Sequence, residues 1–159
     1  PTLNKNNIRL HFIGAIEMLP DHAQKELREA IEDTSKNTGM NLIMALSYSS
    51  RWEIIMATQK IAKAVQEGKL QPEAITPETY KTFLTTAPFP DPELLIRTSG
   101  ENRISNFLLY QIAYTELYFT PTHWPDFRKA DLFAAIAHYQ SRERRFGKTG
   151  EQLKQEKIN

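Results

Sequence analysis

The sequence predicts an α/β fold with a mainly parallel central sheet flanked by helices. Apolar stretches of strand length alternate along the chain with longer segments whose apolar residues repeat at helical spacing. This alternation is typical of parallel α/β proteins. No internal repeat or linker interrupts it, so residues 1–159 are expected to form a single domain. Residues 148–159 are polar and are expected to be a frayed tail.

The first half of the chain supplies two of the expected strands. Ile8–Phe12 alternates apolar and polar residues, which indicates a strand. Asn41–Tyr48 is almost continuously apolar, which favours a strand covered on both faces. Between them, Pro20 and Asp21 open a helix, and Gly39 stands where its C-terminal cap is expected.

The rest of the chain continues the alternation. The further expected elements are a helix over 54–65, a short helix opened by Thr76-Pro77, a strand over 94–96, a helix over 104–114, a strand over 116–119 and a last helix around 132–137. Ligands of open α/β sheets bind beyond the carboxyl ends of the strands. Two such ends are the segments 48–51 and 97–100.

Composition excludes several kinds of function. The chain has 20 basic and 19 acidic residues, a net charge of +1, so it does not have the basic excess of a nucleic-acid-binding protein. It has no cysteine, which excludes disulfides and thiolate metal sites. Its four histidines are scattered and do not have metal-ligand spacing. No apolar run approaches the roughly 20 residues that a membrane-spanning helix needs.

The segment 96–107 has the densest set of functional side chains. Arg97 and Arg103 offer planar guanidinium groups that match phosphate oxygens, and Ser105 can donate a further hydrogen bond. Gly100 would let the backbone approach a ligand, and amides at the start of the following helix would favour an anion. These features predict a phosphate or diphosphate site. The alternative is that both arginines pair with surface carboxylates such as Glu101 and Asp91.

Two other features also have a functional and a structural interpretation. A basic cluster (Arg142, Arg144, Arg145 and Lys148) ends the last helix, where cations are favoured by the helix dipole alone. Glu116 opens an apolar strand, where a carboxylate is costly unless it is paired or binds a metal such as Mg²⁺. An ion pair with an arginine, or simple exposure, is the alternative for Glu116.

Residues 8–14, 47–54, 91–127 and 141–147 resemble blocks of the cis-prenyltransferase family, and they follow one another along the chain in the family's order. Asp91–Phe127 (DPELLIRTSGENRISNFLLYQIAYTELYFTPTHWPDF) resembles the signature region of bacterial undecaprenyl diphosphate synthases. SRERRFG at Ser141–Gly147 resembles the C-terminal signature of the family. IRLHFIG at Ile8–Gly14 and SYSSRWEI at Ser47–Ile54 are similar to two further blocks. The resemblance therefore runs from about Ile8 to Gly147.

The resemblance implies an enzyme that condenses isopentenyl diphosphate with an allylic diphosphate such as farnesyl diphosphate, with Mg²⁺ as cofactor. The product would be a long cis-polyprenyl (undecaprenyl) diphosphate, the precursor of a lipid carrier for cell-wall synthesis. By motif, Arg97, Arg103 and Ser105 would bind isopentenyl diphosphate, and Glu116 would help to bind Mg²⁺. Further candidates for substrate binding are Arg51, Arg144, Arg145 and Gly147. The family also implies a homodimer in the cytoplasm, with peripheral membrane contact through its lipid product.

Three departures from the family pattern qualify this expectation. Ser49-Ser50 replaces the double glycine that is usual before Arg51, and Asn102 stands where many members have histidine. No segment matches the N-terminal block of the type HxxxMDGNGRWA, which carries the catalytic aspartate. The chain also begins with Pro1, which we interpret as a break in a longer chain.

We therefore expect no catalytic residue in this chain and no activity from it alone. The alternative is a catalytically silent subunit that stabilises an active partner. Silent partners in this superfamily tend to lose diphosphate-binding residues, so the presence of Arg97, Arg103, Ser105 and Glu116 argues against this alternative.

Overall fold

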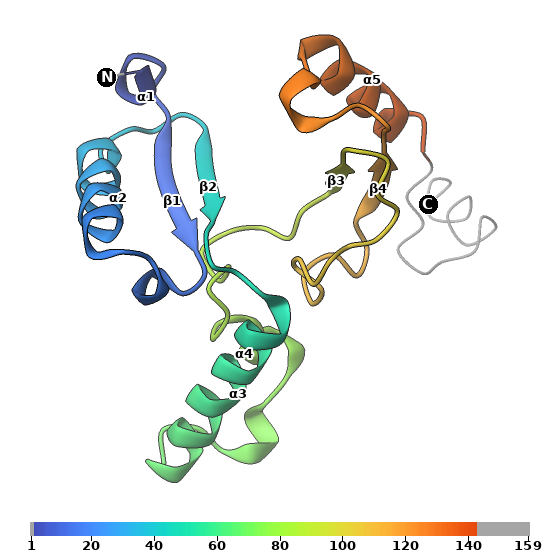
Figure 1. Ribbon diagram of the computed structural model, residues 1–159. Coiled ribbons are helices and arrows are strands. Elements are labelled where there is room, and N and C mark those ends of the chain that lie inside the picture. Colours follow the sequence, from blue (N-terminus) through green and yellow to red (C-terminus); the bar gives the residue numbers. More distant parts are fainter. Residues whose placement is uncertain (1, 143–159) are drawn as a thin grey trace, which may run out of the picture. The chain divides into compact units, whose positions relative to one another are not determined.

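A computed structural model describes residues 2–142 (Figure 1). This part of the chain divides into two compact units, residues 2–90 with 106–108, and residues 91–105 with 109–142. Each unit has one pair of parallel strands accompanied by helices, so the predicted α/β class with parallel strands is confirmed. That the whole chain forms one domain stays a prediction.

The first unit is built on strands β1 (Arg9–Ile13) and β2 (Asn41–Ala45), which pair in parallel from Arg9↔Asn41 to Ile13↔Ala45. Before them lies α1 (Thr2–Lys5). The crossover between the strands contains η1 (Ile16–Met18) and α2 (Asp21–Thr34), which lies beside β1 in Figure 1. Such a crossover is what a parallel strand pair requires.

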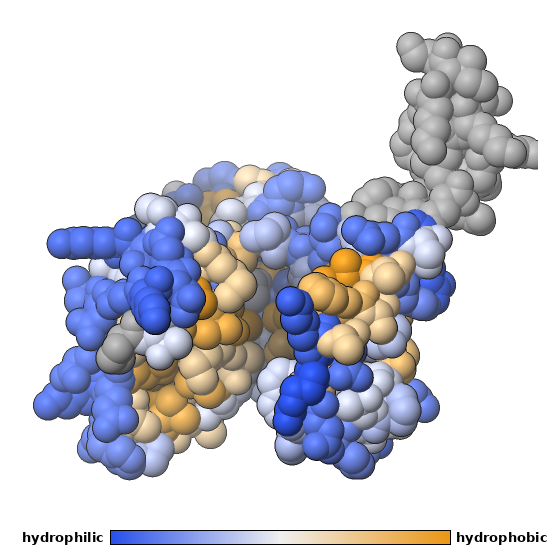
Figure 2. All heavy atoms as spheres, turned by 90° about the horizontal axis from the view of Figure 1, so that it is seen from above, coloured by the Kyte–Doolittle hydropathy of each residue, from blue (hydrophilic) through white to orange (hydrophobic). Residues whose placement is uncertain are grey.

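The predicted covering of β2 on both faces is wrong for the described residues. All five residues of β2 are exposed, including Leu42, Ile43 and Met44. By contrast, β1 contributes the buried Leu10 and Ile13 to the core. The apolar run predicted the position of the strand correctly, but its hydrophobic side chains are exposed. Figure 2 shows one view of the surface, coloured by hydropathy.

Gly39 does not cap the first long helix, as its position in the sequence suggested. Helix α2 ends at Thr34, whose hydroxyl donates to the Ala30 carbonyl (2.9 Å) and accepts from the Leu10 amide (3.1 Å). The helix end is thereby tied to β1. Gly39 donates its N–H to the Asn7 carbonyl at 3.1 Å, and a Cβ there would overlap that oxygen. The glycine is thus explained by a close backbone approach.

Gly14, directly after β1, is expected to tolerate no side chain. Its φ is +114°, and a Cβ would overlap the Leu46 carbonyl oxygen. Gly14→Ala should therefore destabilise the complete protein by about 2 kcal/mol or more. The control is Gly68→Ala, at φ +69° with no atom within 4 Å of the added Cβ, where about 1 kcal/mol is expected. Equal shifts of the denaturant midpoint in both variants would contradict the steric argument.

Three helices complete the first unit. They are α3 (Ser50–Gln66), η2 (Pro72–Ala74) and α4 (Pro77–Lys81). Thr76 caps α4 by accepting the Thr79 amide at 3.2 Å, and Pro77 occupies the first turn, as predicted. Ser49 caps α3 and accepts the Trp52 amide at 3.4 Å.

The second unit is built on strands β3 (Leu94–Arg97) and β4 (Glu116–Phe119), with η3 (Trp124–Asp126) and α5 (Lys129–Gln140) after them. The strands pair in parallel from Leu94↔Glu116 to Arg97↔Phe119. Helix α5 packs beside β4, where the Tyr118 and His138 rings meet edge-on with centroids 5.2 Å apart. Among the described helices, none has the length and apolarity needed to cross a membrane.

The predicted helix over 104–114 is wrong, because this segment consists of turns. Ser105, Asn106 and Leu108 have φ values of +53°, +61° and +49°. These left-handed conformations cannot be part of a right-handed helix. The segment therefore has no helix start whose amides could bind an anion.

Candidate anion-binding site

Arg97 stands at the carboxyl end of β3. It pairs with Phe119 of β4, and its carbonyl accepts the Thr120 amide at 2.9 Å. Its Nη2 donates to the Ser105 hydroxyl at 3.5 Å, whereas its Nε is buried and has no hydrogen-bond partner within the described part of the chain. A buried donor without an acceptor is costly, so this nitrogen is suited to donate a hydrogen bond to a ligand acceptor such as a phosphate oxygen.

The turn after Arg97 is held by the segment that follows β4. Ser99 and Gly100 have φ values of +68° and +69°. Their amides donate to the carbonyls of Thr122 (2.9 Å) and Thr120 (3.0 Å). These amides are therefore occupied by the main chain. An anion in this region would therefore not be bound by these two amides.

Arg103 is mostly exposed and forms an ion pair with Glu101, with Nη1 and Oε2 2.5 Å apart. This is one of the carboxylate pairings that the sequence left open for the two arginines. An exposed pair of this kind contributes only about 0–1 kcal/mol, so a phosphate could replace Glu101 at little cost. The structure brings Arg97 and Ser105 together. The convergence of Arg103 on the same anion stays a prediction.

Glu116 lies at the opposite end of the β3–β4 pair from Arg97. It is in register with Leu94, three residues before Arg97, which corresponds to roughly 10 Å along the strands. Its carboxylate is partly exposed, and its Oε2 is 4.0 Å from the Arg142 Nε. The ion-pair alternative is thus present as a long contact. No group of three or more potential metal ligands occurs among residues 2–142, and metal binding by Glu116 stays a prediction.

Arg51 and three C-terminal residues are the remaining sequence candidates. Arg51 is exposed in the first turn of α3. Before it, Ser49 has an extended backbone and Ser50 is helical, so serine in place of the family's double glycine brings no backbone strain. Arg144, Arg145 and Gly147 lie outside the described residues.

The sequence prediction missed a buried carboxylate in the first unit. Glu53 is 1% exposed and accepts from the Tyr48 hydroxyl (2.5 Å), from the Thr85 amide (2.8 Å) and from the Thr85 hydroxyl. A signal was available, because Glu53 precedes Ala57 and Ile61 at four-residue spacing on one face of α3. Those two residues are buried as well.

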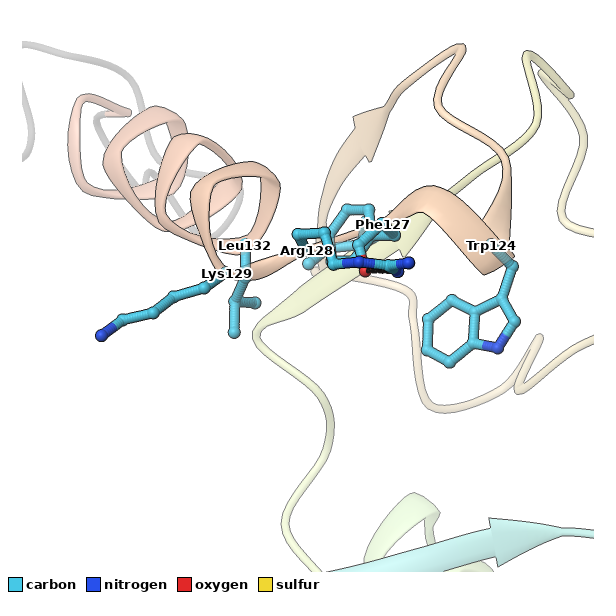
Figure 3. Close-up of a pocket in the computed structure, with 6 residues that line it drawn as sticks. Trp124, Phe127, Arg128, Lys129 and Leu132 are labelled. Atoms are coloured by element: carbon cyan, nitrogen blue, oxygen red, sulfur yellow. Dashed lines mark hydrogen bonds between the residues drawn. The ribbon is translucent and has the colours of Figure 1, made fainter.

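A mostly apolar pocket of about 580 Å³ lies on the second unit, lined by Ile96, Trp124, Phe127, Arg128, Lys129 and Leu132 (Figure 3). The Arg128 guanidinium donates to the carbonyls of Pro125 (2.5 Å) and Phe127 (3.2 Å). Lys129 extends away from the Trp124 and Phe127 rings in Figure 3, and its Nζ lies 5.2 Å from the centre of the Phe133 ring. Because main-chain oxygens already accept hydrogen bonds from the Arg128 guanidinium, this pocket is less suited to an anion than the Arg97–Ser105 pair.

The fold and the Arg97–Ser105 contact together define a class of protein. It is an α/β protein in which a parallel strand ends in an arginine that contacts a serine and retains an unpaired, buried donor. A family model described as putative undecaprenyl diphosphate synthase matches residues 1–147, and the chain belongs to this prenyltransferase family.

Curated relatives agree with the family. The isoprenyl transferase of Chlorobaculum tepidum is 54% identical over 156 residues, which cover 98% of this chain and 59% of the relative. The ditrans,polycis-undecaprenyl-diphosphate synthase of Vibrio cholerae is 48% identical over 152 residues, with 96% and 61% covered. The chain thus spans about three fifths of the length of these relatives.

Solved structures agree with the fold. Lavandulyl diphosphate synthase from Lavandula x intermedia, in complex with dimethylallyl diphosphate, matches with a TM-score of 0.87 and 41% identity over 89% of this chain and 61% of that protein. A probable undecaprenyl diphosphate synthase from Campylobacter jejuni matches with a TM-score of 0.79 and 33% identity over 91% and 65%. The predicted cis-prenyltransferase fold is therefore confirmed.

Proposed function

We propose that this chain supplies the isopentenyl diphosphate site of an enzyme that makes long cis-polyprenyl diphosphates. The observation that carries the proposal is Arg97, whose buried Nε has no partner in the described chain and whose Nη2 contacts Ser105. The names of the relatives, isoprenyl transferase and undecaprenyl-diphosphate synthase, support this class of reaction. So does the lavandulyl diphosphate synthase structure, which is in complex with dimethylallyl diphosphate.

The proposed roles follow from charge and hydrogen bonding. Arg97 and Arg103 would neutralise diphosphate oxygens, and Ser105 would donate a hydrogen bond to one of them. Glu116 would hold Mg²⁺, which takes one or two carboxylates together with phosphate oxygens. A single, partly exposed carboxylate fits such a role only in part, so further ligands would have to join it. When bound, Mg²⁺ would stabilise the negative charge of the departing pyrophosphate.

The test is incorporation of labelled isopentenyl diphosphate into long polyprenyl products by the complete protein, with farnesyl diphosphate and Mg²⁺. Elongation is the expected result, and its absence would contradict the proposal. The 159-residue chain alone is expected to bind isopentenyl diphosphate weakly, at roughly −4 to −6 kcal/mol. We expect no elongation from it, because Glu116 is the one metal ligand proposed here and a single carboxylate holds Mg²⁺ poorly.

Glu116→Ala is expected to lower kcat of the complete protein about tenfold or more, with little change in the KM for isopentenyl diphosphate. The reason is that charge on a departing pyrophosphate develops in the transition state, not in the ground state. The matched control is Arg142→Ala, which removes the partner of Glu116 but leaves the carboxylate. An equal loss of kcat in both variants would show that Glu116 acts through its ion pair.

We further propose a homodimer through the second unit. Leu117 and Phe119 are exposed on β4, and Trp124, which follows β4 in the sequence, is 71% exposed. An isologous contact would bury such a patch against itself, over roughly 1,000 Å² or more. A monomeric mass of the complete protein in solution would contradict it.

The enzyme would act in the cytoplasm, meeting the membrane through its lipid product.

A further inference from the structure

Asn106 is bonded on three sides to the start of α3. Its carbonyl accepts the Ser50 amide at 3.0 Å, and its Oδ1 accepts the Arg51 amide at 3.1 Å. Its Nδ2 donates to the Ser49 hydroxyl at 2.6 Å. These bonds satisfy two amides of the first helical turn, which would otherwise need solvent or a ligand. The N-terminus of α3 is thereby closed by Asn106.

The backbone around Asn106 adopts left-handed conformations, which are unfavourable for residues that have a Cβ atom. Ser105 and Asn106 have φ values of +53° and +61°, and Leu108 has +49°. Asparagine tolerates the left-handed region better than most residues, whereas serine and leucine adopt it only where contacts hold them there. The conformation of Ser105 therefore needs an anchor close by.

The residue after Asn106 adds an apolar contact to this anchor. The Phe107 and Tyr48 rings meet edge-on, with centroids 5.8 Å apart. The Tyr48 hydroxyl in turn donates to the buried Glu53 at 2.5 Å. Asn106 and Phe107 are thus fixed by polar and apolar contacts within the first unit, and Ser105 is joined to them by one peptide bond.

We propose that Asn106 is a positioning residue for the diphosphate site, acting through Ser105. Its three hydrogen bonds hold Asn106 in its left-handed conformation, and the residue before it is Ser105, whose hydroxyl accepts from the Arg97 Nη2. Asparagine suits the position because its amide supplies an acceptor for Arg51 and a donor for Ser49, and because it tolerates a positive φ. The inference rests on the proposed function, since it assigns to Asn106 the alignment of a substrate-binding hydroxyl.

A matched control exists at the other asparagine with a similar geometry. Asn7 has φ +53°, and its carbonyl accepts the Gly39 amide at 3.1 Å. Its side chain accepts the Thr38 amide at 2.9 Å and donates to the Thr38 hydroxyl at 3.3 Å. Asn7→Ala therefore removes the same kind of local structure as Asn106→Ala, in the turn before β1 and not beside Ser105.

The experiment compares Asn106→Ala, Asn7→Ala, Ser105→Ala and the Ser105→Ala/Asn106→Ala double variant in the complete protein. Both asparagine variants should lose similar thermal stability. Only Asn106→Ala should raise the KM for isopentenyl diphosphate, about tenfold, with kcat nearly unchanged. In the double variant the KM should be close to that of Ser105→Ala, because Asn106 acts through that hydroxyl.

Two results would overturn the inference while the proposed function stands. One is a KM for Asn106→Ala that matches Asn7→Ala although Ser105→Ala raises it. The other is a double variant whose KM effect is the product of the two single effects. If the protein elongates but neither Ser105→Ala nor Arg97→Ala changes the KM, the proposed site and this inference both fail.

Discussion

Arg97→Ala in the complete protein is expected to raise the KM for isopentenyl diphosphate by roughly 10- to 100-fold. Each hydrogen bond from a charged donor contributes about 1.5–3 kcal/mol, and 1.4 kcal/mol corresponds to a factor of ten. The buried Nε has no acceptor in the described chain, and the contact with Ser105 is long, at 3.5 Å. Alanine therefore removes bonds to the ligand while breaking few bonds within the protein.

The measurement is the KM for isopentenyl diphosphate at saturating farnesyl diphosphate and Mg²⁺, together with the melting temperature. Arg97→Lys keeps the charge but loses the planar fork, so an intermediate KM is expected. Arg28→Ala, at an exposed position on α2, serves as the control and should change neither quantity. An unchanged KM together with a lower melting temperature would identify Arg97 as a structural arginine instead.

Glu53→Ala is expected to destabilise the complete protein by about 2–4 kcal/mol. The substitution takes the acceptor away from the Tyr48 hydroxyl and the Thr85 amide, in a place where the carboxylate is 1% exposed. A donor deprived of its acceptor inside a protein costs about 1–3 kcal/mol. A destabilisation of about 2–4 kcal/mol lowers the melting temperature of a protein of this length by roughly 5–15 °C.

The matched control is Glu29→Ala on α2, which removes an exposed i,i+4 pair with Lys25. Such a pair contributes about 0.5 kcal/mol or less. Glu53→Gln keeps the shape of the side chain and should fall between the two alanine variants. Denaturant midpoints of the three variants provide the comparison, and equal midpoints for Glu53→Ala and Glu29→Ala would refute a stabilising role for the buried carboxylate.

The strands and short caps were predictable from the sequence because their signals are local. The boundaries of Glu116–Phe119 were predicted residue for residue, and Thr76-Pro77 opens a helix as expected. The segment 104–114 was not predictable, because its apolar residues repeat at helical spacing, whereas its conformation is set by hydrogen bonds to a distant part of the chain. Asn106 bonds to residues more than fifty positions earlier in the chain, and no glycine marks the left-handed residues around it.

The candidate site was predictable in part for the same reason. A basic residue that ends a short apolar strand lies at the carboxyl end of that strand whatever the rest of the chain does, and Arg97 lies there. The opposite placement of Glu116 also follows from the parallel register, but register depends on tertiary pairing and could not be derived from spacing. Glu53 was missed because glutamate is rarely fully buried unless it is paired, and its donors, such as Thr85, are distant in the sequence.

The assignment of Asn106–Leu108 to the first unit has a consequence for dividing the protein. The chain leaves the first unit after Pro90, returns to it at Asn106 and leaves it again after Leu108. No single cut of the chain can therefore release both units intact. A truncation at Pro90 would remove the residues that close the start of α3, and its product would report on a damaged first unit. Separate study of the two units requires the 106–108 tripeptide to be grafted back or supplied as a peptide.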